Sequence, residues 1–151
     1  MVEIACHHVG FTVSNLDRAV AFYQDTLGFV HERTSDLADD FASEVTGLAE
    51  ARMRVAFMRL GELTLELLEY QRPAAARDAF HSNTPGHGHL CFQVEEIGDL
   101  VERIEAQGGR RLGKVTTIPG GPNQGGRVVY VRDPNGVVVE FIQRWRMAGA
   151  G

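Results

Sequence analysis

A strand pattern that occurs twice restricts the fold of this chain more than any other feature of its sequence. The segment His8–Leu16 returns as His89–Ile97, and the segment Thr64–Leu68 returns as Val138–Ile142. Each copy therefore has one His on its first predicted strand and one Glu on its last. Two long copies indicate a duplicated module, because solenoids need at least three shorter repeats.

The first copy begins with a strand and a helix. Apolar and polar residues alternate from Glu3 to Val13, which is the period of a half-buried strand. Either Ser14 or Asn15 can cap the helix that follows, because apolar residues then recur at helical spacing. Gly28 can adopt the left-handed conformation that commonly ends a helix.

Two more strands complete the first copy. We expect an irregular stretch over residues 34–50. Strands are then predicted over 53–60 and 63–70, joined across the turn residue Gly61. The first copy therefore contains one helix among several strands.

The second copy repeats the first after a connector. Residues 73–88 contain prolines and glycines that interrupt regular structure, although 74–80 could form a short helix. The predicted elements of the second copy are a strand over 89–94, a helix over 97–107, and strands over 127–132 and 137–143 that are separated by the turn 133–136. We therefore predict an α+β fold of two βαβββ modules.

The glycine-rich segment 119–126 lies between predicted elements of the second copy. It does not follow a strand and open a helix, as a phosphate-binding loop does. It is interpreted either as a passive connection or as a lid over a site.

The duplicated His and Glu residues are the candidate metal ligands. Because side chains alternate across a strand, these residues would converge if their faces line the inside of a curved sheet. A carboxylate among apolar residues is costly to bury without a partner, and a metal relieves that cost. We predict one divalent metal site at His8, Glu66, His89 and Glu140.

Two further His residues are rival ligands. His7 is adjacent to His8, and His87 lies two residues before His89. We prefer His8 and His89 because each directly precedes the hydrophobic strand pattern. A lone strand His or Glu is more often an ordinary structural or surface residue, but four in matched registers favour a site.

Composition and charge exclude several classes of function. The 151 residues are 44% hydrophobic and 23% charged, which is typical of one folded domain. The net charge of -5, without a cluster of Lys or Arg, argues against nucleic acid as a partner. We find neither a membrane-spanning apolar run nor a signal peptide, and Cys6 and Cys91 are too few for a disulfide framework. We therefore expect a cytoplasmic protein with no membrane partner.

The chain resembles the vicinal oxygen chelate superfamily, which includes glyoxalase I, methylmalonyl-CoA epimerase, extradiol dioxygenases, fosfomycin-resistance enzymes and bleomycin-binding proteins. The resemblance covers nearly the whole chain and is carried by residues 8–13, 17–23, 27–29 and 132–141. It implies a single domain over 1–151 in which two modules form a cupped mixed sheet with helices on the outside. The expected bounds are about 3–71 for module one, 72–86 for the connector and 87–146 for module two.

The resemblance also implies a chemistry. The family's four ligand positions fall on His8, Glu66, His89 and Glu140. Extradiol enzymes use two His and one carboxylate, so the second carboxylate, Glu66, favours the redox-neutral branch. The implied function is that of a divalent-metal-dependent lyase or isomerase in which Glu140 or Glu66 transfers the proton. Nickel, cobalt, zinc, manganese and iron(II) all accept these ligands.

Two alternative functions stay open. One is an iron(II) extradiol-type dioxygenase, and the other is a metal-free drug-binding resistance protein. Glyoxalase I enzymes of bacteria usually have an Arg shortly after the first His, and the run Val9–Thr12 has none.

The partners implied are a small-molecule substrate and a second copy of the chain. Relatives pair their modules within one chain or between two, so we expect a homodimer. We expect Phe57 to line an apolar part of the substrate pocket. Arg127, beside the glycine-rich segment, is the basic residue expected to contact an anionic substrate group.

Overall fold

The computed structural model of the chain describes residues 3–74 and 81–145. By its internal contacts the chain divides into two compact units, Met1–Asp78 and Ala79–Gly151. Each unit contains one of the two predicted modules. Both modules combine a mixed sheet with helices, which confirms the predicted α+β class.

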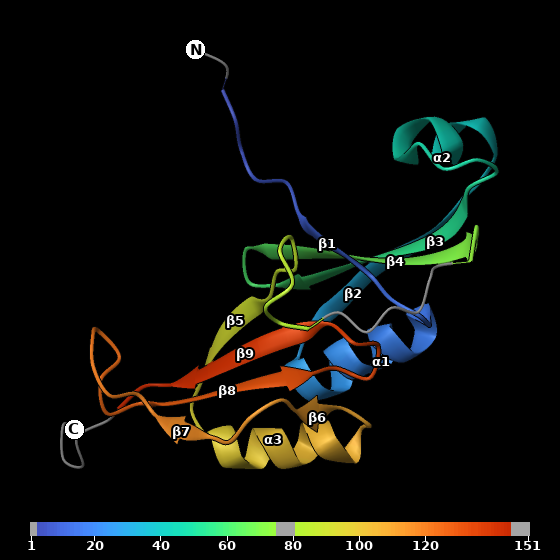
Figure 1. Ribbon diagram of the computed structural model, residues 1–151. Helices are drawn as coiled ribbons and strands as arrows, with labels where there is room; N and C mark the ends of the chain where they lie inside the picture. The colour runs from blue at the N-terminus through green and yellow to red at the C-terminus, as the bar shows by residue number, and fades with distance from the viewer. Residues whose placement is uncertain (1–2, 75–80, 146–151) are drawn as a thin grey trace. The chain divides into compact units, whose positions relative to one another are not determined.

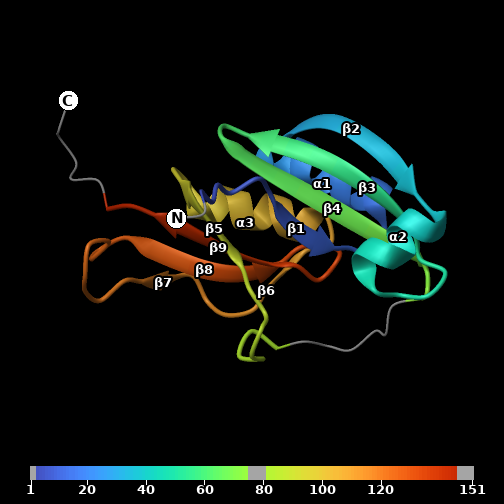
Figure 2. The ribbon, with the colours of Figure 1, turned by 90° about the horizontal axis from the view of Figure 1, so that it is seen from above.

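The first unit is built on a four-stranded sheet (Figure 1). Its elements are β1 (Val9–Thr12), α1 (Leu16–Leu27), β2 (Val30–Leu37), α2 (Asp39–Thr46), β3 (Arg52–Leu60) and β4 (Leu63–Arg72). The strand order is β1-β4-β3-β2, in which β1 runs parallel to β4 and the other pairs are antiparallel. Helix α2 lies at one end of this sheet (Figure 2).

Helix α1 covers one face of the first sheet. Asn15 is its cap and accepts a hydrogen bond from the backbone N–H of Arg18, and Gly28 ends it with a φ of 76°. The apolar stripe that begins at Leu16 is buried, as are Leu65 and Leu67 of β4. Because side chains alternate along a strand, the residue between these two leucines points to the opposite face.

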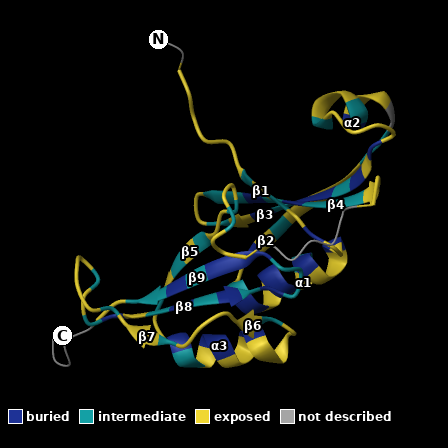
Figure 3. Ribbon diagram, in the orientation of Figure 1, coloured by how far each residue is buried: buried dark blue, intermediate teal, exposed yellow. Residues whose placement is uncertain are grey.

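The second unit repeats this plan. Its elements are β5 (Leu90–Val94), α3 (Ile97–Ala106), β6 (Arg110–Arg111), β7 (Thr116–Thr117), β8 (Arg127–Arg132) and β9 (Val138–Gln143). The strand order is β5-β9-β8-β6, with β7 paired to β8, and β5 is parallel to β9. Helix α3 buries its apolar stripe on the side of the sheet and exposes its other side (Figure 3).

The same hydrogen bond starts the first helix of each unit. The backbone N–H of Leu16 donates to the carboxylate of Glu69 at 3.2 Å, and that of Ile97 donates to the side-chain oxygen of Gln143 at 2.9 Å. Both acceptors lie three residues after the duplicated Glu on the last strand of the module. The duplication therefore includes the hydrogen bond between the last strand of each module and the first residue of its helix.

Two predictions about the first unit were wrong. The predicted strand over 3–13 is limited to β1, because β4 offers pairing partners only to residues 9–12. The stretch 34–50, expected to be irregular, contains the end of β2 and all of α2. Strand β2 is an edge strand with few buried residues, so it lacks the alternation that predicts a strand.

The other predicted strands and both long helices are confirmed within a few residues, whereas the short strands β6 and β7 were not expected. The possible helix over 74–80 falls almost wholly outside the described residues. Segment 119–126 closes the hairpin of β7 and β8, with backbone hydrogen bonds between Ile118 and both Gly125 and Gly126. Among the described helices, none is long and apolar enough to cross a membrane.

Candidate metal-binding site

In the first unit the structure brings His8 together with Glu66. His8 directly precedes β1, whose parallel register with β4 pairs Gly10 with Glu66. The His8 Nε2 and Glu66 Oε2 atoms lie 3.2 Å apart, and the Glu66 side chain is only 17% exposed. Phe57 is the β3 partner of Glu66, and its ring packs edge-on against His8 with centroids 5.8 Å apart. The half-buried carboxylate and the imidazole therefore face the same point.

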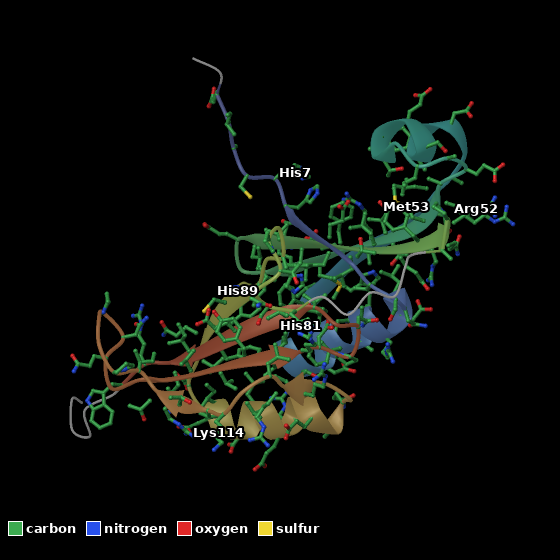
Figure 4. The ribbon with its side chains drawn as sticks, in the orientation of Figure 1. His7, Arg52, Met53, His81, His89 and Lys114 are labelled. Atoms are coloured by element: carbon green, nitrogen blue, oxygen red, sulfur yellow. The ribbon has the colours of Figure 1, made fainter. Side chains whose placement is uncertain are left out.

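In the second unit His89 and Glu140 form an equivalent pair. His89, labelled in Figure 4, directly precedes β5, whose register with β9 pairs Cys91 with Glu140. The His89 Nε2 and Glu140 Oε2 atoms lie 3.0 Å apart, and the Glu140 side chain is 15% exposed. The Tyr130 hydroxyl on β8 donates to Glu140 Oε2 at 3.1 Å and lies 3.3 Å from His89 Nε2.

The groups beside Glu140 have raised pKa values. Burial raises the pKa of the Cys91 thiol to about 11, and the charge of Glu140 and a hydrogen bond to it add to this effect. Burial also raises the pKa of Tyr130, again with Glu140 as a further cause. Both groups therefore stay protonated near neutral pH and can donate to the carboxylate.

The spacing of both pairs suits two neighbouring ligands of one metal. Metal bonds of about 2.1 Å that meet at a right angle put their donor atoms about 3.0 Å apart. The observed separations are 3.2 Å and 3.0 Å, and both pairs combine an imidazole nitrogen with a carboxylate oxygen. Within the described ranges no group of three or more His, Cys, Asp or Glu side chains forms such a site. Each unit by itself thus brings together two side chains that could serve as metal ligands.

The rival His residues occupy different positions. His7 lies in the segment before β1 (Figure 4), and its Nδ1 is 2.7 Å from Nδ1 of His8. His87 lines a cavity of about 260 Å³ in the second unit together with Ser82, Asn83, Gly88, His89, Tyr130 and Val138. The His89 imidazole and the Tyr130 phenol therefore border a space that admits a small molecule.

The two residues expected to bind substrate differ in their positions. Phe57 lies beside His8 and Glu66, as described above. Arg127 is the exposed first residue of β8, and strand alternation puts its side chain on the face of the buried Val129, opposite Tyr130. Its expected contact with an anionic group stays a prediction.

Sequence reasoning missed two residues near the pairs. Tyr130 could have been found by aligning β8 with β3, since it occupies the place that Phe57 has in the first unit. Arg33 places its guanidinium 4.1 Å from the centroid of the Phe57 ring. No sequence signal identifies Arg33, because its neighbour Phe57 is reached only through the irregular register of β2 and β3.

The chain is similar to several known proteins in sequence and in fold. The chain is 37% identical to a 2-epi-5-epi-valiolone epimerase of an Actinomyces species, over 92% of this chain and 79% of that protein. It is 32% identical to the lactoylglutathione lyase of Haemophilus influenzae, over 90% of both chains. The crystal structure of a glyoxalase family protein from Bacillus cereus superimposes with a TM-score of 0.83 at 24% identity and covers 97% of both chains.

A sequence model of one superfamily spans both units and both His–Glu pairs, matching residues 5–141. Its match includes all four residues of the two pairs, together with Phe57 and Tyr130. The resemblance of the sequence to the vicinal oxygen chelate superfamily is thereby confirmed. The chain belongs to the Glyoxalase/Bleomycin resistance protein/Dioxygenase superfamily.

Proposed function

We propose that the chain is a divalent-metal-dependent lyase or isomerase that moves a proton next to a substrate oxygen. The observation that carries this proposal is the duplicated His–Glu pair, with donor atoms 3.2 Å and 3.0 Å apart. The relatives that are an epimerase and a lactoylglutathione lyase support it, because both names describe redox-neutral reactions.

The residues that would hold the metal are His8, Glu66, His89 and Glu140, with two ligands from each module. One chain or two chains of a homodimer would supply both modules of a site. A divalent metal bound there supplies Lewis-acid polarisation of a substrate oxygen, which stabilises negative charge on that oxygen. Two neutral imidazoles and two carboxylates suit nickel, cobalt, zinc, manganese or iron(II).

The carboxylates of the site perform the proton transfer. Glu66 or Glu140 takes a proton from the carbon next to the polarised oxygen, and the electron pair of that C–H bond moves into an enediolate. The same carboxylate then returns the proton to the substrate. Both side chains are mostly buried, which raises the strength of their electrostatic interactions with a substrate.

The substrate is a small oxygen-bearing organic molecule. The cavity beside His89 and Tyr130 has a volume of about 260 Å³, which admits a molecule of modest size. Phe57 provides an apolar surface beside His8. Arg33 is the candidate contact for an anionic group, because it stacks directly on Phe57.

Hydrogen–deuterium exchange at carbon tests this proposal. Protein purified without chelators is loaded with nickel, cobalt, zinc, manganese or iron(II) and incubated in D₂O with 2-epi-5-epi-valiolone or with lactoylglutathione. We expect NMR to show metal-dependent deuterium incorporation next to a substrate oxygen, without oxygen uptake. Metal-stripped protein is the control.

Two other results would overturn the proposal. Oxygen consumption that requires iron(II) and a catechol would support a dioxygenase. Tight binding of an aromatic drug by protein that retains no metal would support a drug-binding protein.

A further inference from the structure

A row of opposite residues crosses the first sheet at the His8–Glu66 pair. The strand registers place Gly10 opposite Glu66, Glu66 opposite Phe57, and Phe57 opposite Arg33. Side chains of directly opposite residues point to the same face of a sheet. Two strand spacings separate β4 from β2, so the backbones of Glu66 and Arg33 lie about 10 Å apart. Arg33 is therefore on the face of the candidate site.

A β-bulge in β2 puts Arg33 into this row. The register of β2 and β3 is irregular directly before Arg33, where Glu32 is an extra residue without an opposite residue on β3. In a regular register Glu32 would lie opposite Phe57, and a carboxylate would replace the guanidinium on the face of the site. Bulges commonly redirect a side chain next to a functional site. Glu32 instead forms an ion pair with Arg59, with Oε1 and Nε 2.7 Å apart.

Arg33 differs from its neighbours in having no acid partner. Arg54 on β3 pairs with Asp17 at 2.8 Å, and Arg59 is paired as described above. Among the residues that the structure describes, no carboxylate forms an ion pair with Arg33, and its guanidinium lies over the Phe57 ring. A stacked guanidinium keeps N–H donors at its edge, where they can bind a carboxylate or phosphate in a bidentate manner.

The second module has no charge at the equivalent place. The backbone N–H of Leu112 donates to the carbonyl oxygen of Tyr130 at 2.8 Å, which continues the register of β6 along β8. Leu112 thus lies opposite Tyr130, as Arg33 lies opposite Phe57. Its apolar side chain offers no hydrogen bond to an anion. Of these two equivalent places, only the one in the first module suits an anionic group.

We propose that the substrate carries a carboxylate or phosphate group, joined by a short carbon linker to the oxygen that faces the metal, and that Arg33 recognises this group. This inference rests on the function proposed above. The Phe57 ring lies between the two ends, with its centroid 5.8 Å from that of the His8 ring and 4.1 Å from the Arg33 guanidinium carbon. The apolar ring packs against the linker, and Arg33 binds the anionic end.

The first test compares anionic hydroxyketones with neutral ones. The anionic probes are δ-hydroxylevulinate and dihydroxyacetone phosphate, and their neutral counterparts are methyl δ-hydroxylevulinate and dihydroxyacetone. Calorimetric titration of the metal-loaded chain should give a Kd for an anionic probe that is about 10- to 100-fold lower than that of its counterpart, because hydrogen bonds between charged groups are strong. A preference shown by one anionic probe alone identifies the group as a carboxylate or as a phosphate.

The second test removes the guanidinium. In Arg33→Gln the preference for the anionic probe should be lost, while the Kd of each neutral probe stays the same, which a merely structural role would not produce. Arg33→Lys retains the charge without the planar pair of donors and should give an intermediate preference. Arg18→Gln is the matched control, because Arg18 is exposed on α1, which covers the other face of this sheet. It should keep the full preference.

Urea unfolding and deuterium exchange complete the experiment. Arg33 is exposed, so Arg33→Gln should unfold at the same urea concentration as the unchanged chain. Equal Kd values for anionic and neutral probes in the unchanged chain, a preference that persists in Arg33→Gln, or no binding of any probe would overturn this inference. Metal-dependent exchange of the neutral probes would then still support the proposed function. A preference that Arg33→Gln removes, without metal-dependent exchange of any probe, would support the anion contact and count against the proposed function.

Discussion

Replacing Glu140 by Ala should remove the stabilisation that a bound metal gives to the folded chain. The Glu140 carboxylate is 15% exposed and is the shared acceptor of His89, at 3.0 Å, and of Tyr130, at 3.1 Å. Loss of an outer hydrogen-bond partner of a metal ligand typically costs about 10- to 100-fold in metal affinity. Loss of the ligand itself should cost at least about 100-fold.

The expected size of the effect follows from ligand linkage. A metal at 100 times its Kd stabilises the folded state by about 2.7 kcal/mol, and a metal at its Kd by about 0.4 kcal/mol. In a chain of this size each kcal/mol moves the Tm by about 2–4 °C. The metal should therefore raise the Tm of the unchanged chain by about 5–10 °C and that of Glu140→Ala by about 1–2 °C.

Differential scanning calorimetry with and without metal measures both shifts. Glu102→Ala is the control, because Glu102 is an exposed carboxylate on α3 of the same unit. It should keep the full shift of the unchanged chain. A full shift in Glu140→Ala as well would refute the assignment of Glu140 as a ligand.

Three further predictions concern stability, charge and assembly. In Gly126→Ala the new Cβ would lie 2.5 Å from the Gln143 carbonyl oxygen. Urea unfolding should therefore show a free energy of unfolding that is lower by about 1–3 kcal/mol, and an unchanged midpoint would contradict this close packing. A hydrogen bond from Arg54 holds the pKa of the Asp17 carboxyl below its ordinary value of 3.8. This ion pair therefore persists at neutral pH and is lost only as the pH falls through that lowered pKa. NMR titration should find the pKa of Asp17 nearer 3.8 in Arg54→Ala than in the unchanged chain. Light scattering at micromolar concentration should give twice the chain mass of 16.6 kDa, and a mass of one chain would remove the homodimer.

The parts of the fold that repeat were predictable from the sequence. The helix from Leu16 to Leu27 and the strands β3 and β4 follow apolar periods that burial requires, and the second module repeats them. Strand β2 and helix α2 were missed because they bury few side chains, and Phe41 and Val45 of α2 are largely exposed. A periodic pattern of apolar residues arises where one face of a strand or helix is buried. Elements that bury few side chains therefore have no clear apolar period in their sequence.

The two His–Glu pairs of the candidate site could be predicted from the sequence, but the residues around them could not. His8 with Glu66 and His89 with Glu140 could be chosen because each pair repeats at matched registers, and the structure brings each pair within 3.2 Å. The role of Tyr130 depends on which residue of a neighbouring strand lies opposite Glu140. That register is set by tertiary pairing, so alternation within one strand could not reveal it.

The central claim is that both modules contribute ligands to one divalent metal. It is tested most directly by metal analysis of protein purified without chelators, in the unchanged chain and in the variants His8→Ala and His89→Ala, one from each His–Glu pair. We predict about one metal ion per chain in the unchanged protein and loss of most of that metal in each variant, because every ligand of a four-ligand site contributes to affinity. Full metal retention in His8→Ala would show that the first module does not take part, and would contradict the account.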